Sequence, residues 1–150
     1  MESVLNLSYA LDTLYFLLCG ALVMWMAAGF SMLEAGLVRA KNTTEILTKN
    51  VTLYAIASVM YMLFGYQFMY PADPVNSFWP GFGFLLGAEN VPAEVLAQSA
   101  DTWYDGNSYS NRADFFFQVV FVATAMSIVS GAVAERMRLW PFFAFAIVMT

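Results

Sequence analysis

The stretch that decides the fold is ADFFFQVVFVATAMSIVSGAVAERMRLW, residues 113–140. Between Asp114 and Glu135 it contains 20 consecutive residues without a charge. A helix that rises about 1.5 Å per residue needs about 20 residues to cross the hydrocarbon core of a bilayer. Aromatic rings gather at one end of this run and small residues at the other. A span that only had to cross lipid could be mostly leucine, so we expect this helix to pack against others.

Composition also places the chain in a membrane. Of its 150 residues, 61% are hydrophobic and 11% are charged, whereas soluble domains carry about 25% charged residues. Two further uncharged runs, Thr13–Leu33 with 21 residues and Asn50–Ala72 with 23, are long enough to span. We therefore predict an all-α polytopic membrane protein. A fourth apolar run, Leu139–Thr150, is too short to cross, which predicts that the chain is part of a longer protein and does not function alone.

The chain lacks residues that several classes of function require. The chain has no histidine and a single cysteine, Cys19, so an internal disulfide is excluded, and a metal site or histidine-based catalysis is not expected. We expect no cofactor and no nucleic-acid partner. The first residues, MESVLNLSYALD, lack the basic segment of a cleavable signal peptide.

The basic residues are distributed unevenly between the loops. They are Arg39, Lys41 and Lys49 between the first two runs, Arg136 and Arg138 after the third, and Arg112 alone in the acidic segment 73–114. Because short loops rich in lysine and arginine stay cytoplasmic, the N-terminus should lie outside. We expect a multi-pass protein of the cell membrane (the inner membrane in a Gram-negative bacterium). The expected elements are helices at about 11–35, 43–70 and 114–138, an external loop at about 71–113 and the start of a fourth helix at about 140–150.

Two glutamates stand at the inner ends of spans, where the helix dipole disfavours an anion. Glu34 and Glu135 could each pair with a nearby arginine, Arg39 or Arg136, or cap a neighbouring helix. They could instead be buried anchors that tie spans together, because intramembrane carboxylates need partners. A direct part in proton movement is a third interpretation, with the least support. In the turn between the first two spans, Asn42 followed by Glu45 predicts an N-cap with a capping box.

Small residues recur every four positions in the third span, at Ala123, Ser127 and Gly131. Such a stripe lets helix backbones approach closely, which matters because lipid offers no hydrophobic drive for helix association. The pattern predicts a multi-helix bundle. Small residues that line a narrow pore would show the same spacing, so the sequence leaves both interpretations open.

The aromatic end of this span contains a pair of rings on one helix face. Phe117 and Phe121 are four residues apart and should meet near the outer end. Phe115 and Phe116 point elsewhere, toward lipid or a partner. Paired phenylalanines usually serve packing, but a pair that faces a pathway would attract a cation by about 0.5–2 kcal/mol while blocking water.

The combination of two motifs resembles the ammonium transporter family (Amt/Mep/Rh), and its Amt branch in particular. FFFQVVFVATAMSIVSGAVAERMR is similar to the third helix of that family, and GFSMLEAGLVRAKNTTEIL is similar to the end of its first helix and the following inside loop. Together they cover the three predicted spans, in the family's order and in the topology derived above.

The resemblance implies the ammonium transporter fold, an eleven-helix bundle with inverted repeats, of which this chain would be the N-terminal part. It implies a homotrimer with one pore per subunit and a PII-type regulatory protein on the cytoplasmic side. Phe117 and Phe121 match the stacked phenylalanines that gate the pore, with Phe121 beside the external ammonium site. The family's pore histidines, and a Trp and a Ser that recruit ammonium, belong to later helices.

The activity that the resemblance implies is movement of ammonium or ammonia, with methylammonium as an analogue. This is transport without covalent chemistry, so the resemblance implies no enzymatic activity. The family mechanism, recruitment at an aromatic vestibule followed by separate movement of ammonia and a proton, avoids placing a charge in an apolar pore. An ammonium sensor, with the same membrane helices joined to a signalling module, is the alternative. A quinone- or haem-binding redox subunit is disfavoured because no span carries a histidine.

Overall fold

The structure is a computed structural model that describes residues 2–70, 83–86 and 109–150. Within those ranges the chain is helical and contains no strand. The helices are α1 (Glu2–Leu37), α2 (Thr43–Met60), α3 (Tyr66–Met69), α5 (Asn111–Ala132) and α6 (Leu139–Met149), with a 3₁₀ turn at Ala40–Asn42 and a π-helical turn at Tyr61–Gly65. The predicted all-α class is confirmed.

Three helical segments are long and apolar enough to cross a membrane, by length and composition. They are Asn6–Leu37, Ala40–Met69 and Asn111–Ala132. The second is continuous from α2 to α3, because the π-helical turn between them keeps the backbone helical. The predicted polytopic membrane architecture is confirmed at this level. Helix α6 is apolar but shorter.

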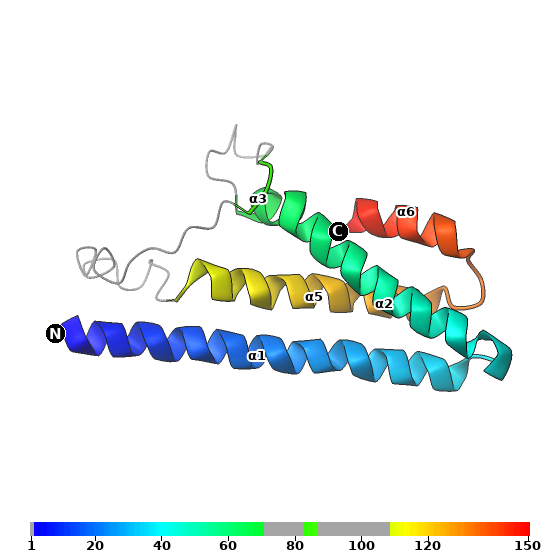
Figure 1. Cartoon of the computed structure of the whole chain (residues 1–150), viewed down its shortest axis with the longest axis horizontal. Coiled ribbons are helices and arrows are strands. Elements are labelled where there is room, and N and C mark those ends of the chain that lie inside the picture. Colours follow the sequence, from blue (N-terminus) through cyan, green and yellow to red (C-terminus); the bar gives the residue numbers. More distant parts are fainter. Residues whose placement is uncertain (1, 71–82, 87–108) are drawn as a thin grey trace.

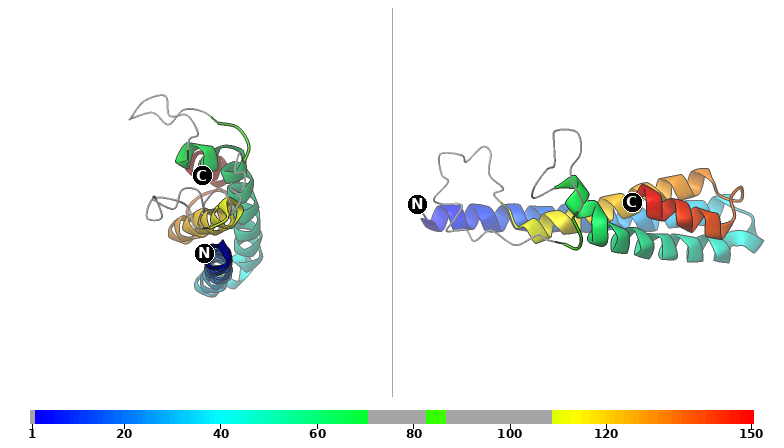
Figure 2. Two further views of the ribbon diagram at one scale, coloured as in Figure 1. Left: turned by 90° about the vertical axis from the view of Figure 1, so that its left-hand side faces the viewer. Right: turned by 90° about the horizontal axis from the view of Figure 1, so that it is seen from above.

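The three long helices lie side by side, and α5 packs along α1 and against α2 (Figure 1). Helix α6 packs against α2, and the two further views show the same arrangement of the helices (Figure 2). The turn from α1 to α2 and the turn from α5 to α6 lie at the same end of the bundle, on the right in Figure 1. We call this the turn end, and we call the opposite end, where α3 stops and α5 begins, the loop end.

Small and aromatic side chains fill the core between α2, α5 and α6. One cluster joins six buried residues, namely Leu53, Ala57, Ala123, Met126, Phe142 and Ala146. The alanines on three different helices allow the backbones to approach, so that the single large ring of Phe142 can be enclosed at 1% exposure. Many large apolar side chains remain exposed, among them Trp25 at 73%. Such surfaces are typical of helices that face lipid or other helices.

The helix bounds differ from the predicted ones at the start of α1 and at the end of α5. Helix α1 starts at Glu2 instead of about residue 11, and α5 ends at Ala132 instead of about residue 138. Glu135 has a φ of 60°, a left-handed conformation that an α-helix cannot continue. Glu135, Arg136 and Arg138 therefore belong to a turn. Most of the expected external loop, 71–82 and 87–108, lies outside the described residues.

The predicted capping box is wrong. Asn42 is the N-cap residue of α2, but its side chain makes no cap hydrogen bond. Its amide Nδ2 donates instead to Glu135 Oε1, 2.6 Å away. The Asn42 amide therefore bonds the carboxylate of Glu135, in the turn after α5, and not the backbone of its own helix. Sequence spacing within one helix cannot predict a partner from so distant a part of the chain.

Candidate functional site

The two predicted gate rings lie next to each other on α5 near the loop end. The ring centroids of Phe117 and Phe121 are 5.1 Å apart with planes at 57°, so the pair is tilted and not parallel. Phe16 from α1 meets Phe117 edge to face at 5.4 Å. Phe121 is 44% exposed. One ring is thus held by a neighbouring helix, and the other faces open space.

The two preceding phenylalanines pack within the bundle, so the expectation that they face lipid or a partner is wrong. Phe115 stacks on Tyr61 at 5.9 Å between centroids and meets Tyr66 edge to face at 5.5 Å. Phe116 lies against Gly20 of α1, where an added Cβ would come within 2.7 Å of its ring. The missing side chain of Gly20 therefore makes room for an aromatic ring.

An exposed stripe runs along α5 from the gate pair toward the turn end. Phe121, Ala125, Ile128 and Ala132 are all exposed and recur at the three- and four-residue spacing of one helix face. The stripe is apolar throughout. It could face lipid, another helix or a pathway.

A polar group at the loop end, beside the gate pair, was not predicted. The Asp114 side chain is 5% exposed and lies 3.5 Å from both Tyr66 Oη and Gln118 Nε2, which donate to it. Gln118 Nε2 also donates to Tyr70 Oη at 3.3 Å. Burial, followed by the nearby Asp114 carboxylate, raises the pKa of the Tyr70 phenol. Only the position of Asp114 at the start of the uncharged run hinted at this group.

Four buried polar residues meet near the turn end, from three helices. We call Glu34, Lys49, Asn50 and Ser130 the buried polar cluster; none is more than 7% exposed. Asn50 Nδ2 donates to Glu34 Oε2 at 3.3 Å. Ser130 Oγ lies 3.0 Å from Glu34 Oε2 and 2.9 Å from Asn50 Oδ1. Helices α1, α2 and α5 are joined here through polar contacts.

Lys49 supplies the positive charge of the cluster. Its Nζ donates to the Ser130 carbonyl oxygen at 3.2 Å and lies 3.9 Å from Glu34 Oε2. It also sits 5.1 Å from the centroid of the Phe142 ring on α6, within the range of a cation–π contact. Within the described residues Glu34 makes no ion pair with Arg39 or Arg136, which was the first predicted interpretation. Its buried position is compatible with the second interpretation, an anchor between spans.

A second charged group closes the turn end at the surface. Glu135 Oε1 accepts hydrogen bonds from the backbone N–H and Nε of Arg39, each at 3.2 Å, and from Asn42. We call Glu135, Arg39 and Asn42 the turn cluster. The Asn42 amide, followed by the two Arg39 donors, holds the pKa of the Glu135 carboxyl below its usual value. Glu135 thus pairs with Arg39 across two turns instead of with Arg136 beside it.

Ala123 and Ser127 of the small-residue stripe face the other helices of the bundle, whereas Gly131 at its end is exposed. Ala123 is fully buried in the core cluster, Ser127 is 2% exposed, and Gly131 lies beside Glu34, where an added Cβ would be 3.5 Å from Oε1. These positions fit a packing role. The topology residues Lys41, Arg136 and Arg138 are exposed at the turn end.

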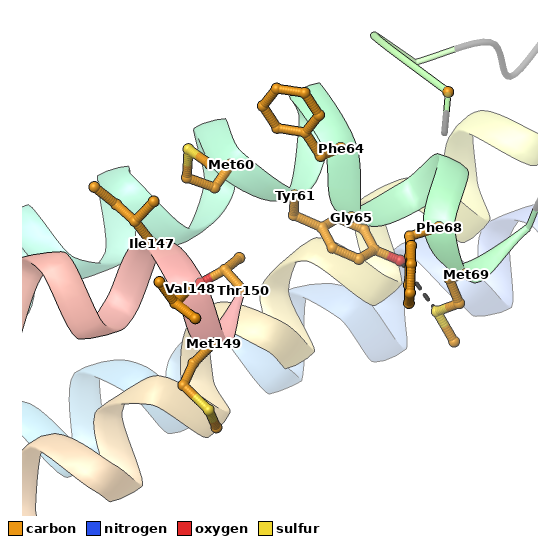
Figure 3. Close-up of a pocket in the computed structure, with 11 residues that line it drawn as sticks. Met60, Tyr61, Phe64, Gly65, Phe68, Met69, Ile147, Val148, Met149 and Thr150 are labelled. Carbon is orange, nitrogen blue, oxygen red and sulfur yellow. Dashed lines mark hydrogen bonds between the residues drawn. The ribbon is translucent and has the colours of Figure 1, made fainter. Parts of the chain in front are cut away.

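Several cavities open near these groups, one of which, of about 240 Å³, is lined by Asn50 and Ser127. A polar cavity of about 280 Å³ at the turn end is lined by residues of α2 and the turn after α5, including Lys49, Glu45 and Arg138. A larger apolar cavity of about 760 Å³ lies between α2, the π-helical turn and the end of α6 (Figure 3). Within the described residues, no three His, Cys, Asp or Glu side chains gather into a metal-binding group.

Comparison with known proteins places this arrangement in a family. Residues 14–150 match the sequence model of the Ammonium Transporter Family. The chain belongs to the Ammonium Transporter Family. It is 38% identical over 99% of its length to a Synechocystis protein provisionally named an ammonium transporter, and 34% identical over 97% to ammonium transporter Amt2 of Archaeoglobus fulgidus. It is 37% identical over 99% to ammonium transporter 3 of Dictyostelium discoideum.

The chain spans about three tenths of the length of these ammonium transporters, namely 31%, 27% and 30%. Membership of the ammonium transporter family, in the branch whose relatives are named Amt, confirms the resemblance that the two sequence motifs indicated. The family is one of transporters. The roles of individual residues, including the gate pair, are not addressed by these likenesses.

Proposed function

We propose that this chain forms part of a channel or transporter that moves ammonium or ammonia across the cell membrane. Phe117 and Phe121 would gate a hydrophobic pore. The observation that carries the proposal is the position of this pair: two adjacent rings, 5.1 Å apart, at the start of the exposed apolar stripe of α5. A pathway along that stripe would begin at the rings and continue over apolar side chains.

The physics of this arrangement suits a small cation that loses its charge. Ring faces attract a cation by about 0.5–2 kcal/mol, depending on how far it is desolvated. An intact charge in the apolar stretch beyond would cost several times more. The cation would therefore be held at the Phe121 side and give up its proton before passage. The proton would take a separate route.

Other residues would support this function by holding the helices together and by fixing the orientation of the chain in the membrane. Ala123, Ser127, Gly131, Glu34 and Glu135 would hold the helices together, and Arg39, Lys41, Arg136 and Arg138 would keep the turn end cytoplasmic, with the N-terminus outside. A homotrimer in the lipid bilayer and a cytoplasmic PII-type regulatory partner are further proposals, made from the family resemblance. No covalent chemistry is required, so we propose transport without enzymatic activity.

Uptake is the direct test. The protein expressed from its complete coding sequence, placed in cells that lack their own carrier, should accumulate labelled methylammonium and should lose that uptake when ammonium competes. Retained ammonium binding without uptake would favour the alternative, an ammonium sensor joined to a signalling module. Absence of both binding and uptake would contradict the proposal.

The gate is tested by truncating one ring. Phe121→Ala should change uptake by about ten- to thirtyfold, which corresponds to about 1.4–2 kcal/mol in the barrier or in the binding of the cation. Phe145→Ala on α6 is the matched control, because Phe145 has a similar exposure of 37% but lies on another helix. Phe115→Ala should change uptake far less per folded molecule. Equal, small effects of all three variants would leave Phe121 as a packing residue.

A further inference from the structure

The buried polar cluster contains a closed ring of three contacts. Glu34 Oε2, Ser130 Oγ and the side-chain amide of Asn50 each lie within hydrogen-bond distance of the other two, at 3.0, 2.9 and 3.3 Å. All three groups are at least 96% buried, and buried polar groups find their hydrogen-bond partners mainly within the protein. Every contact in the ring therefore needs one hydrogen from the ring's own members.

The hydrogens can be counted. Ser130 has one hydroxyl hydrogen, and the Asn50 amide supplies one hydrogen to Glu34 Oε2. If Ser130 donates to Asn50 Oδ1, the 3.0 Å contact between Ser130 Oγ and Glu34 Oε2 has no hydrogen unless Glu34 carries one. If Ser130 donates to Glu34, Asn50 Oδ1 lacks a donor. Two hydrogens serve three contacts, and the ring is one proton short.

The orientation of the Asn50 amide decides which of the three contacts lacks a hydrogen. With its oxygen and nitrogen exchanged, the nitrogen donates to Ser130 Oγ and Ser130 donates to Glu34 Oε2. The contact between Asn50 and Glu34 then places two oxygens 3.3 Å apart, longer than an ordinary O–H···O hydrogen bond, and a proton on Glu34 relieves the repulsion between them. In either orientation a proton on Glu34 Oε2 favours the ring.

The second oxygen of Glu34 provides an independent indication. Oε1 is buried and has no hydrogen-bond partner. It faces Gly131, which offers no side chain, at the place where a Cβ would lie 3.5 Å away. An unpartnered oxygen of a neutral carboxyl group costs much less in a buried site than an unpartnered oxygen of a carboxylate, because the latter carries a share of a full charge.

Charged groups around Glu34 allow the ionised form as well. Lys49 from α2 lies 3.9 Å from Oε2, a long ion pair, while its closer contacts are the Ser130 carbonyl oxygen and the Phe142 ring. Glu45, one turn before Lys49, lines the same polar cavity and offers a second carboxylate to the lysine. At the surface Glu135 is engaged by Arg39. Within the described residues, neither α5 nor α6 brings a further charge to Glu34.

We propose that Glu34 is a proton-binding site: Oε2 carries a proton that closes the ring with Ser130 and Asn50, and releases it to leave a carboxylate opposite Lys49. The ligand is a single proton. It arrives from water in the polar cavity at the turn end, whose wall includes Lys49, and returns there. In the protonated form Lys49 keeps its hydrogen bond to Ser130 and its contact with Phe142, with Glu45 as the remaining carboxylate near it.

Infrared difference spectroscopy tests this site without reference to transport. The protein expressed from its complete coding sequence is reconstituted in lipid vesicles and taken from acid to alkaline pH. A carbonyl band of a buried, protonated carboxyl group should be present in the wild-type protein at acid pH, disappear as the pH rises, and be lost in Glu34→Gln. Glu45→Gln, on the same cavity but exposed, should keep the band.

Glu34→Gln also tests the proposal through its folding and thermal stability. The amide that Glu34→Gln introduces would donate to Ser130 Oγ as the proton does, so this variant should fold and retain the thermal stability of the acid form. The proposal is overturned if Glu34→Gln and wild type show the same protonated-carboxyl bands at every pH, or if Glu34→Gln fails to fold. A failed uptake assay with this band intact would reject the transport proposal alone.

Discussion

The buried polar cluster and the turn cluster use the same chemistry at the same end of the bundle, in different surroundings. Each has one glutamate, one basic residue and one asparagine, which is Asn42 at the N-cap of α2 in one cluster and Asn50 within α2 in the other. In the turn cluster the contacts are shorter, 2.6 Å from Asn42 and 3.2 Å from Arg39. In the buried polar cluster they are 3.3 Å from Asn50 and 3.9 Å from Lys49.

Burial, more than contact length, should decide which cluster matters for stability. The Glu34 and Lys49 side chains are 4% and 8% exposed, whereas those of Glu135 and Arg39 are 27% and 66% exposed. Water can replace a lost partner at the surface but cannot do so in the bundle. The comparison therefore predicts that the longer contacts of the buried polar cluster contribute more to stability than the shorter contacts of the turn cluster.

The largest effect is expected when the buried cation is removed. Lys49→Met keeps much of the side-chain volume but leaves the Glu34 carboxylate without a nearby cation, and breaking a buried pair in this way costs about 3–5 kcal/mol. If Glu34 can bind a proton, that cost should shrink on acidification. Unfolding in mixed detergents at two pH values measures both quantities. Arg39→Met is the matched control, and an equal loss in both variants would contradict the comparison.

A smaller loss of stability is expected when the asparagine of either cluster is replaced. Asn50→Leu removes a donor to Glu34 and the acceptor of Ser130, leaving buried polar groups unpaired at about 1–3 kcal/mol each. Asn42→Leu removes the shorter contact at the surface and should cost much less. Tryptophan fluorescence during thermal unfolding in detergent ranks the two variants. If Asn42→Leu is the more destabilising, contact length outweighs burial and the comparison fails.

The sequence predicts elements better than partners, and the two glutamates show why. The uncharged runs identify the spans because crossing a bilayer imposes a length, and a spacing of four brings Phe117 and Phe121 together because a helix has a fixed period. The partners of Glu34 come from residues 15 or more positions away, on two other helices. Only the packing of those helices brings Lys49 and Ser130 to it.

The end of α5 shows the same limit in a different way. The charged residues after Ala134 are compatible with a continuing helix, so the predicted third helix ran to about residue 138. The left-handed conformation of Glu135 places its carboxylate beside Arg39 and Asn42, 96 and 93 residues away in the chain. A helix end fixed by such distant partners has no local signature, in contrast to a glycine or proline stop.

The smallest expected effect is the change with pH in how much the turn cluster contributes to stability. Hydrogen bonds from Asn42 and Arg39 hold the pKa of Glu135 below its ordinary value of 4.5. A group with a lowered pKa stabilises the folded state above the ordinary pKa, and loses that contribution as the pH falls through the folded-state value. The thermal unfolding midpoint of wild type should therefore exceed that of Glu135→Gln by a constant amount at neutral pH, and the difference should shrink below about pH 4.5.

Salt provides the control for this last expectation. The turn cluster is exposed to solvent, so the difference between wild type and Glu135→Gln should also narrow as ionic strength rises. The Lys49→Met difference should be nearly insensitive to salt because ions do not enter the bundle. A difference at Glu135 that persists in acid and in salt would mean that the side chain acts through shape and neutral hydrogen bonds. The two clusters would then differ in kind, and burial alone would not explain the comparison.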